Sequence, residues 1–153
     1  GFNFDTCMFV TEEKDKAMNK GHLSAFDIIL TSRGTLGNVA LYDNNIPYKN
    51  VRINSGMLIM RPKTERISAY FIYALLKSGY MKIAIEQFRS GSAQPQLPIK
   101  DLQKISFDIP DNDTILKTAD KQFQALEETI SKNKCEIDKL KALSSVLLSE
   151  LSR

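Results

Sequence analysis

The feature that most constrains the fold is residues 113–151, a long stretch that contains neither proline nor glycine. Its apolar residues recur at spacings of three and four, which places them along one stripe of an α-helix. At a rise of about 1.5 Å per residue, such a helix is roughly 60 Å long, about twice the diameter of a small domain. Most of the stripe therefore extends beyond its own domain, and we expect it to contact a second helix.

The stripe has the register of a coiled coil. With Phe123 at position a of the heptad, and with Ser144 at a further a position, the predicted interface consists of Phe123, Leu126, Ile130, Asn133, Ile137, Leu140, Leu147 and Leu151. Asn133 is a polar residue at a d position, where such a residue fixes register or partner choice at some loss of stability. The alternative is a long helix that packs on the core of its own domain.

Charge and hydropathy narrow the class of protein. Residues 1–110 contain 14 Lys and Arg against 10 Asp and Glu, whereas residues 111–153 contain 7 against 8. A weak basic bias on the globular part permits contact with nucleic acid but does not require it. No apolar run approaches the roughly 20 residues of a membrane-spanning helix, and the N-terminus has no signal-peptide pattern. We predict a cytoplasmic protein whose Cys7 and Cys135 are free thiols.

The first half of the chain has the pattern of a sheet. Runs rich in Ile, Val, Phe and Met predict strands at residues 25–31, 38–42 and 55–61, each bounded by turn residues. The short glycine-containing turn between the first two strands predicts a hairpin.

After the predicted strands, the apolar residues recur with the spacing of an α-helix. Residues 67–88 predict two consecutive helices or one broken helix, because Ser-Gly interrupts the apolar face near residue 78. Residues 99–104 predict one helical turn, and the alternation over residues 105–109 predicts an edge or closing strand. Asp and Asn at residues 111–113 offer N-cap side chains for the long helix. The predicted fold class is α+β: a mixed domain over 1–110 and a projecting helix over 111–153.

The sequence lacks the motifs of common enzymes. His22 is the only histidine, and a surface role suits its glycine-flanked polar stretch better than catalysis. There is no zinc-ligand spacing, no nucleophile elbow and no metalloprotease helix motif. Gly34 and Gly37 are too close together for a P-loop, and no lysine follows them. We predict no catalytic residue, no metal ligand and no cofactor held by this chain.

Two polar loops remain as candidate binding surfaces. Residues 31–38 concentrate hydroxyl groups, an arginine and an amide on a turn whose glycines allow close backbone approach to a ligand. Residues 90–96 are similar, and Lys100 follows them. Gln pairs with adenine and Arg with guanine in duplex DNA. Composition alone nevertheless favours the alternative of two ordinary surface loops.

Four segments resemble the specificity (S) subunits of type I restriction-modification systems. They are residues 27–43, residues 53–62, residues 71–102 and the terminal helix, and the run GSAQPQLPIKDL at 91–102 is the most specific. The resemblance covers residues 25–153. In that family the recognition domain usually begins well before a segment like residues 25–43, so we expect an upstream part to be missing here.

The resemblance implies a non-catalytic role in DNA recognition. In that family, an S subunit carries two target-recognition domains, and each reads one half of a bipartite DNA sequence. The conserved helices that follow them pair as an antiparallel coiled coil. The implied partners are double-stranded DNA, methyltransferase (modification) subunits, a restriction subunit, and a second recognition half or a homodimer through the terminal helix. S-adenosylmethionine and ATP would be bound by the partner subunits.

The resemblance also implies that the two polar loops face DNA. The DNA-binding residues it suggests are Arg33, Thr35, Asn38, Ser90, Ser92, Gln94, Gln96 and Lys100, with Gln94 the best candidate for a base edge. One alternative is an assembly scaffold that does not bind DNA and acts through its coiled-coil helix. Another is RNA binding by the GxxG at residues 34–37, although a KH loop lies between two helices and this one lies between two strands.

Overall fold

The computed structural model describes residues 1–4, 6–64, 66–91 and 94–151. Its sheet is antiparallel, with the strand order β2-β1-β3. After the short helix α1 (Glu12–Ala17), the strands are β1 (Ile28–Thr31), β2 (Val39–Leu41) and β3 (Met57–Met60). Ile29 of β1 lies opposite Ala40 on one side and Ile59 on the other. The predicted α+β class and the predicted hairpin are confirmed, with strands shorter than the apolar runs.

The central strand is apolar on both faces. Ile28 and Leu30 are fully buried and belong to the main core, whereas Ile29 points to the opposite face and is also buried. A strand covered on both faces has a continuous apolar sequence, rather than an alternating one. This explains why the run Ile-Ile-Leu occupies the middle of the sheet.

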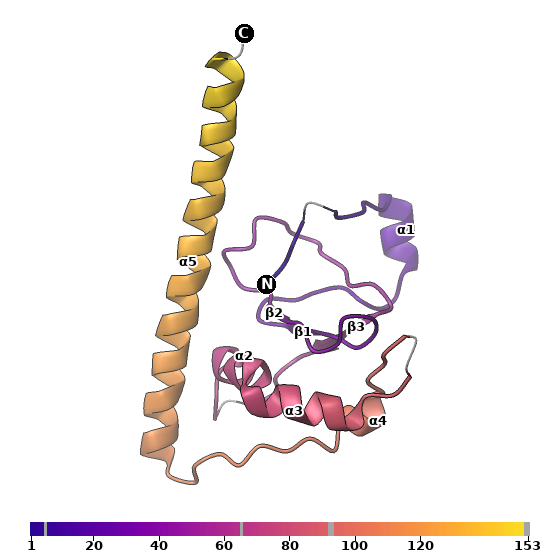
Figure 1. The fold of residues 1–153 in the computed structure, drawn as a ribbon, viewed down its shortest axis with the longest axis vertical. Coiled ribbons are helices and arrows are strands. Elements are labelled where there is room, and N and C mark those ends of the chain that lie inside the picture. The colour runs from indigo at the N-terminus through magenta and orange to yellow at the C-terminus, as the bar shows by residue number, and fades with distance from the viewer. Residues whose placement is uncertain (5, 65, 92–93, 152–153) are drawn as a thin grey trace.

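Three helices follow the sheet: α2 (Ala69–Lys77), α3 (Gly79–Phe88) and the single turn α4 (Ile99–Leu102). Ser78 separates α2 from α3, because its backbone N–H closes the end of α2 on Leu75 and its hydroxyl accepts the N–H of Met81, 3.2 Å away. The two helices lie along one side of the sheet (Figure 1). Their apolar faces complete the core with Tyr70, Tyr73, Leu76, Met81 and Ile85.

The prediction of an edge or closing strand at residues 105–109 is wrong. This segment is irregular and passes along α3 on its way from α4 to α5 (Figure 1). Its alternation has a different cause, because Ile105 and Phe107 pack against the core from outside the sheet. The ring of Phe107 lies 5.3 Å from that of Tyr80 in α3. Alternate burial thus occurs here without a neighbouring strand to bond to.

Helix α5 (Asp113–Leu151) is the predicted long C-terminal helix. The side chain of Asn112 accepts the N–H groups of Thr114 and Ile115 at 2.9 and 3.2 Å, which satisfies donors that the first turn leaves free. The first part of α5 lies against α2, and the remainder extends past the rest of the chain (Figure 1). The helix therefore both joins the domain and projects from it.

The domain covers one face of α5 through residues spaced by three and four. Phe123 meets the ring of Phe71 edge to face at 5.5 Å, and Lys77 bonds Glu127 at 2.8 Å. The residues of α5 that are buried against the domain, or that meet it through a ring contact or a hydrogen bond, include Asp113, Leu116, Asp120, Phe123, Glu127, Ser131 and Lys134. Most of these are polar, so this face is not visible as an apolar stripe.

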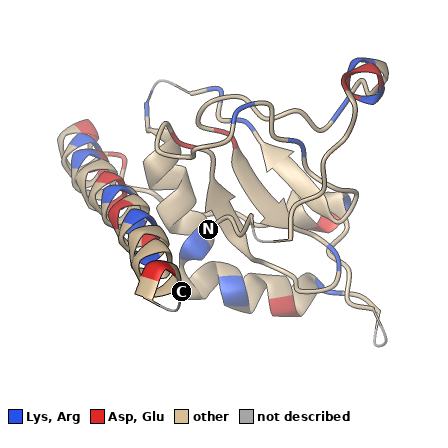
Figure 2. Cartoon of the chain, turned by 90° about the horizontal axis from the view of Figure 1, so that it is seen from above, with Lys and Arg blue, Asp and Glu red and all other residues tan. Residues whose placement is uncertain are grey.

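The predicted coiled-coil stripe lies mainly on another face of α5. Leu126 is 53% exposed, Ile137 is 50% exposed and Leu147 is 51% exposed, and Phe123 alone belongs to both faces. Acidic and basic residues are mixed along the helix (Figure 2). Among the described residues, none of the helices combines the length and the apolar character that spanning a lipid bilayer requires. The apolar stripe thus stays open over the projecting part of α5.

Candidate nucleic-acid interface

The first candidate loop, residues 31–38, is a rigid turn, and we call it the hairpin turn. Thr31 and Asn38 are joined by a backbone hydrogen bond of 3.0 Å, and the Thr31 hydroxyl accepts the N–H of Asn38 at 2.9 Å. The same hydroxyl donates to the carbonyl of Thr35. The predicted residues Arg33, Thr35 and Asn38 are all exposed on this turn. Their backbone is therefore fixed while their side chains face outward.

The two glycines of the hairpin turn have different surroundings. Both have positive φ, +71° at Gly34 and +78° at Gly37. A Cβ on Gly37 would lie 2.7 Å from Cδ1 of Ile85 in α3, whereas a Cβ on Gly34 would meet nothing within 4 Å. Gly37 thus lets the turn pack on the core. Gly34 is the glycine that leaves room for a ligand.

The second candidate loop connects α3 to α4, and we call residues 89–98 the α3–α4 loop. Ser90 and Gln96 exchange two backbone hydrogen bonds, at 2.9 and 2.8 Å, which close its base. Leu97 is buried and anchors the loop in the core, whereas Ser90, Gln94 and Gln96 are exposed. Ser92, which we also predicted to bind DNA, lies outside the described residues.

The structure brings these two loops together, although they are far apart in the sequence. The N–H of Gly34 donates to the carbonyl of Pro95 at 3.1 Å, and the N–H of Leu97 donates to the carbonyl of Ser32 at 2.9 Å. Arg33 and Gln96 form an isolated antiparallel bridge. The two loops therefore form one surface. Lys100 is exposed on α4, and no hydrogen bond or ion pair joins it to a described residue of either loop.

A third segment belongs to the same surface and was not predicted. The carbonyl of Gly56 accepts the N–H of Ser32 at 2.8 Å, the N–H of Arg33 at 3.2 Å and the hydroxyl of Ser32 at 3.2 Å. Gly56 belongs to residues 54–57, the Asn54 turn, which the sequence analysis assigned largely to a strand. The signal that could have found it is the Asn-Ser-Gly run before β3. We call the hairpin turn, the described residues of the α3–α4 loop and the Asn54 turn together the loop face.

The charge of the loop face is positive. Its three segments contain no Asp or Glu. Among the arginines that the structure describes, Arg33 alone has no acidic partner, because the others pair with Asp15, Asp27, Asp113 and Glu86. An exposed guanidinium with no acidic partner suits a phosphate or a guanine edge.

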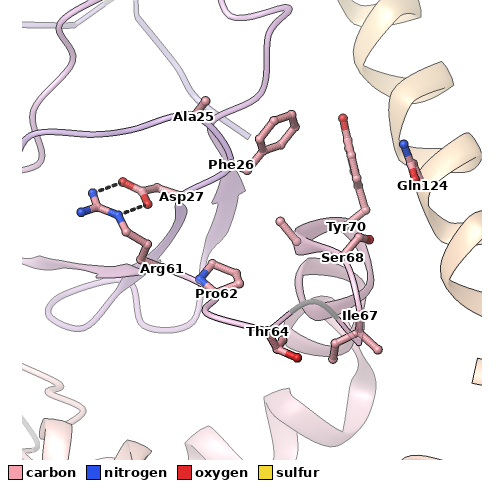
Figure 3. A pocket seen from close by; sticks show the side chains of 11 residues that line it. Ala25, Phe26, Asp27, Arg61, Pro62, Thr64, Ile67, Ser68, Tyr70 and Gln124 are labelled. Atoms are coloured by element: carbon pink, nitrogen blue, oxygen red, sulfur yellow. Dashed lines mark hydrogen bonds and ion pairs between the residues drawn. The ribbon is translucent and has the colours of Figure 1, made fainter. Parts of the chain in front are cut away.

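The opposite end of the sheet has a pocket of about 350 Å³, lined by residues just before β1, residues just after β3, the start of α2 and Gln124 of α5 (Figure 3). Asp27 lies on its wall, fully buried, and accepts two hydrogen bonds from Arg61, at 2.7 and 2.6 Å. Burial alone would raise the pKa of the Asp27 carboxyl, but Arg61 and the N–H of Ser24 hold it below its ordinary value. Both carboxyl oxygens are therefore occupied, and the pair joins the start of β1 to the end of β3.

The described ranges hold no group of three or more His, Cys, Asp or Glu side chains arranged to bind a metal ion. What the geometry offers is a polar, positively charged surface on the domain, together with a long helix that projects from the same domain. A family described as type I restriction modification DNA specificity domain matches residues 10–142. The chain therefore belongs to this family, and the membership supports a role in type I restriction-modification DNA recognition. The search of curated proteins gave no match.

Proposed function

We propose that this chain reads one half of a bipartite duplex DNA target through the loop face. The observation that carries the proposal is the pair of backbone bonds between the hairpin turn and the α3–α4 loop, Gly34 to Pro95 and Leu97 to Ser32. These bonds join two polar segments into one exposed surface that has an unpaired arginine and no acidic residue. Sequence-specific reading of DNA needs such side chains on a backbone held in register.

Several polar side chains at the loop face have a proposed role that follows from their chemistry. Arg33 contacts phosphate or a guanine edge, and Gln94 and Gln96 offer paired donors and acceptors to a base. The hydroxyls of Thr35 and Ser90 suit phosphate oxygens. Asn38 stands at the end of the turn and is exposed. We assign Lys100 to the phosphate backbone at the rim of the surface.

The open stripe of α5 pairs with a second helix in this proposal. The second helix belongs to a second recognition half or to another copy of the chain, and the pair holds the two readers apart. Exposed Ile130, Ile137, Leu140 and Leu151 support this role, since a single projecting helix leaves them in water. Methyltransferase and restriction subunits carry out the chemistry with S-adenosylmethionine and ATP, and the chain itself is not catalytic.

Sedimentation velocity with labelled duplex DNA of random sequence tests the proposal. We expect a dimer that binds the duplex, with an affinity that falls steeply as salt rises, because contacts to phosphates release counterions. Substituting Ile137→Asp and Leu140→Asp together should give a monomer that still binds, more weakly. A chain that binds no duplex even at low salt would contradict the DNA-reading role.

A second candidate is an assembly scaffold that acts only through α5. The exposed stripe of α5 favours it independently of the loop face, since that stripe predicts association whether or not DNA is bound. The same experiment separates the two candidates. A dimer that binds none of the duplexes tested, but that co-purifies with a co-expressed methyltransferase subunit, would favour the scaffold.

A further inference from the structure

The side chain of Asn54 is held in one orientation at the loop face. Its Oδ1 accepts the N–H of Gly56 at 2.9 Å, and its backbone carbonyl accepts the N–H of Met57 at 3.2 Å. These two bonds form a closed turn that ends where β3 begins. The amide of Asn54 is exposed, and its Nδ2 group bonds to no described residue.

Asn54 also lies next to Arg33. A Cβ built on Gly56 would lie 3.3 Å from Oδ1 of Asn54 and 3.7 Å from Cβ of Arg33, so the two side chains leave the surface from adjacent positions. The carbonyl of Gly56 bonds the backbone of Arg33 at 3.2 Å, which keeps the Asn54 turn and the hairpin turn in register. Whatever Arg33 contacts is therefore within reach of Asn54.

We propose that Asn54 is a specificity-determining residue that reads an adenine edge beside the contact made by Arg33. An asparagine amide pairs with adenine through one acceptor and one donor. Oδ1 keeps a second lone pair after it accepts the Gly56 N–H, and Nδ2 keeps both hydrogens. Because the amide is already fixed, binding immobilises no further rotamer there. This inference rests on the proposed DNA-reading function and names a residue that was not predicted.

The test selects sequences from a duplex pool with a randomised central segment, using the wild-type chain, Asn54→Ser and the control Asn44→Ser. Serine keeps an oxygen that can close the turn on Gly56, but it removes the amide. Asn44 is exposed beyond the other end of β2, so Asn44→Ser makes the same chemical change away from the loop face. Circular dichroism and melting temperature check that all three chains fold alike.

We expect wild type and Asn44→Ser to select the same consensus with an adenine at one position. Asn54→Ser should lose roughly 5- to 150-fold discrimination at that position alone. The salt dependence of binding should stay unchanged, because a neutral amide releases no counterion. If Asn54→Ser selects the wild-type consensus with equal preference, the inference is overturned while the proposed function stands. If the wild type selects no consensus, the proposed function and this inference both fail.

Discussion

The carbonyl of Ser32 accepts the backbone N–H of Leu97 at 2.9 Å, and this bond joins the hairpin turn to a residue that is buried in the core. Ser32 also bonds Gly56 on its other side, so the start of the hairpin turn lies between two other segments. The polar side chains of all three segments therefore project from a common backbone frame. DNA binding at this surface, as proposed, would therefore require little ordering of the described backbone.

The packing of Gly37 on Ile85 predicts an unequal effect of two matched substitutions. Gly37→Ala adds a methyl group at 2.7 Å from Ile85 and also strains a positive φ, whereas Gly34→Ala strains a similar φ in open space. We expect Gly34→Ala to destabilise the chain by about 1 kcal/mol. Gly37→Ala should cost about 1–3 kcal/mol more, because it also overpacks the core. Urea unfolding measures both, and equal losses would show that the contact with Ile85 contributes nothing.

The two faces of α5 predict different effects of two neighbouring substitutions. Phe123→Ala removes the ring that meets Phe71, so we expect a loss of about 2 kcal/mol in the free energy of unfolding, less than for a fully buried ring. Leu126→Ala changes a residue that is 53% exposed, and it should leave the stability of the monomer nearly unchanged. It should weaken dimerisation instead, measured by sedimentation over a range of concentrations. Loss of monomer stability in Leu126→Ala would place that side chain against the domain.

The long helix and the hairpin could be predicted from the sequence because both depend on local patterns. A heptad repeat in a stretch without proline or glycine, and a glycine-containing turn between two apolar runs, are visible in the sequence without any tertiary contact. The absence of an edge strand could not be predicted in this way. Burial alternates over Ile105 and Phe107 as it would in a strand, although these residues have no strand partner. The face of α5 that packs on the domain was missed, because Asp120, Glu127 and Ser131 are polar and bond specific partners.

The candidate surface was predictable only in part. The sequence predicts Arg33, Gln94 and Gln96 as site residues because polar side chains gather near glycine and proline in two loops. Their proximity depends on the backbone hydrogen bonds from Gly34 to Pro95 and from Leu97 to Ser32. Local sequence patterns do not predict such long-range hydrogen bonds. The Asn54 turn joins the same surface through Gly56, whereas the sequence pattern places residues 55–57 of this turn in the strand predicted over 55–61.

The buried pair of Asp27 and Arg61 predicts a stability that depends on pH. Asp27→Asn removes a charge-assisted pair of hydrogen bonds, and we expect a loss of about 1.5–3 kcal/mol at neutral pH. Because the pKa of Asp27 in the folded chain is lowered, its contribution is present above the unfolded value of about 3.9. It is lost as the pH falls through the lower folded value. The difference in the free energy of unfolding between wild type and Asp27→Asn, measured by urea unfolding, should therefore narrow below about pH 4. A difference that stays constant with pH would contradict this prediction.

The most direct test of the loop face compares Arg33→Ala with Arg66→Ala in duplex binding, followed by fluorescence anisotropy over a range of salt concentrations. Both substitutions remove one positive charge, but Arg66 lies near Asp113 at the start of α5, and Arg33 lies on the loop face without an acidic partner. We predict that Arg33→Ala weakens binding at least about fivefold, while Arg66→Ala stays within about twofold of wild type. If Arg33→Ala and Arg66→Ala bind duplex DNA with equal affinity at every salt concentration, the loop face is not the surface that reads DNA.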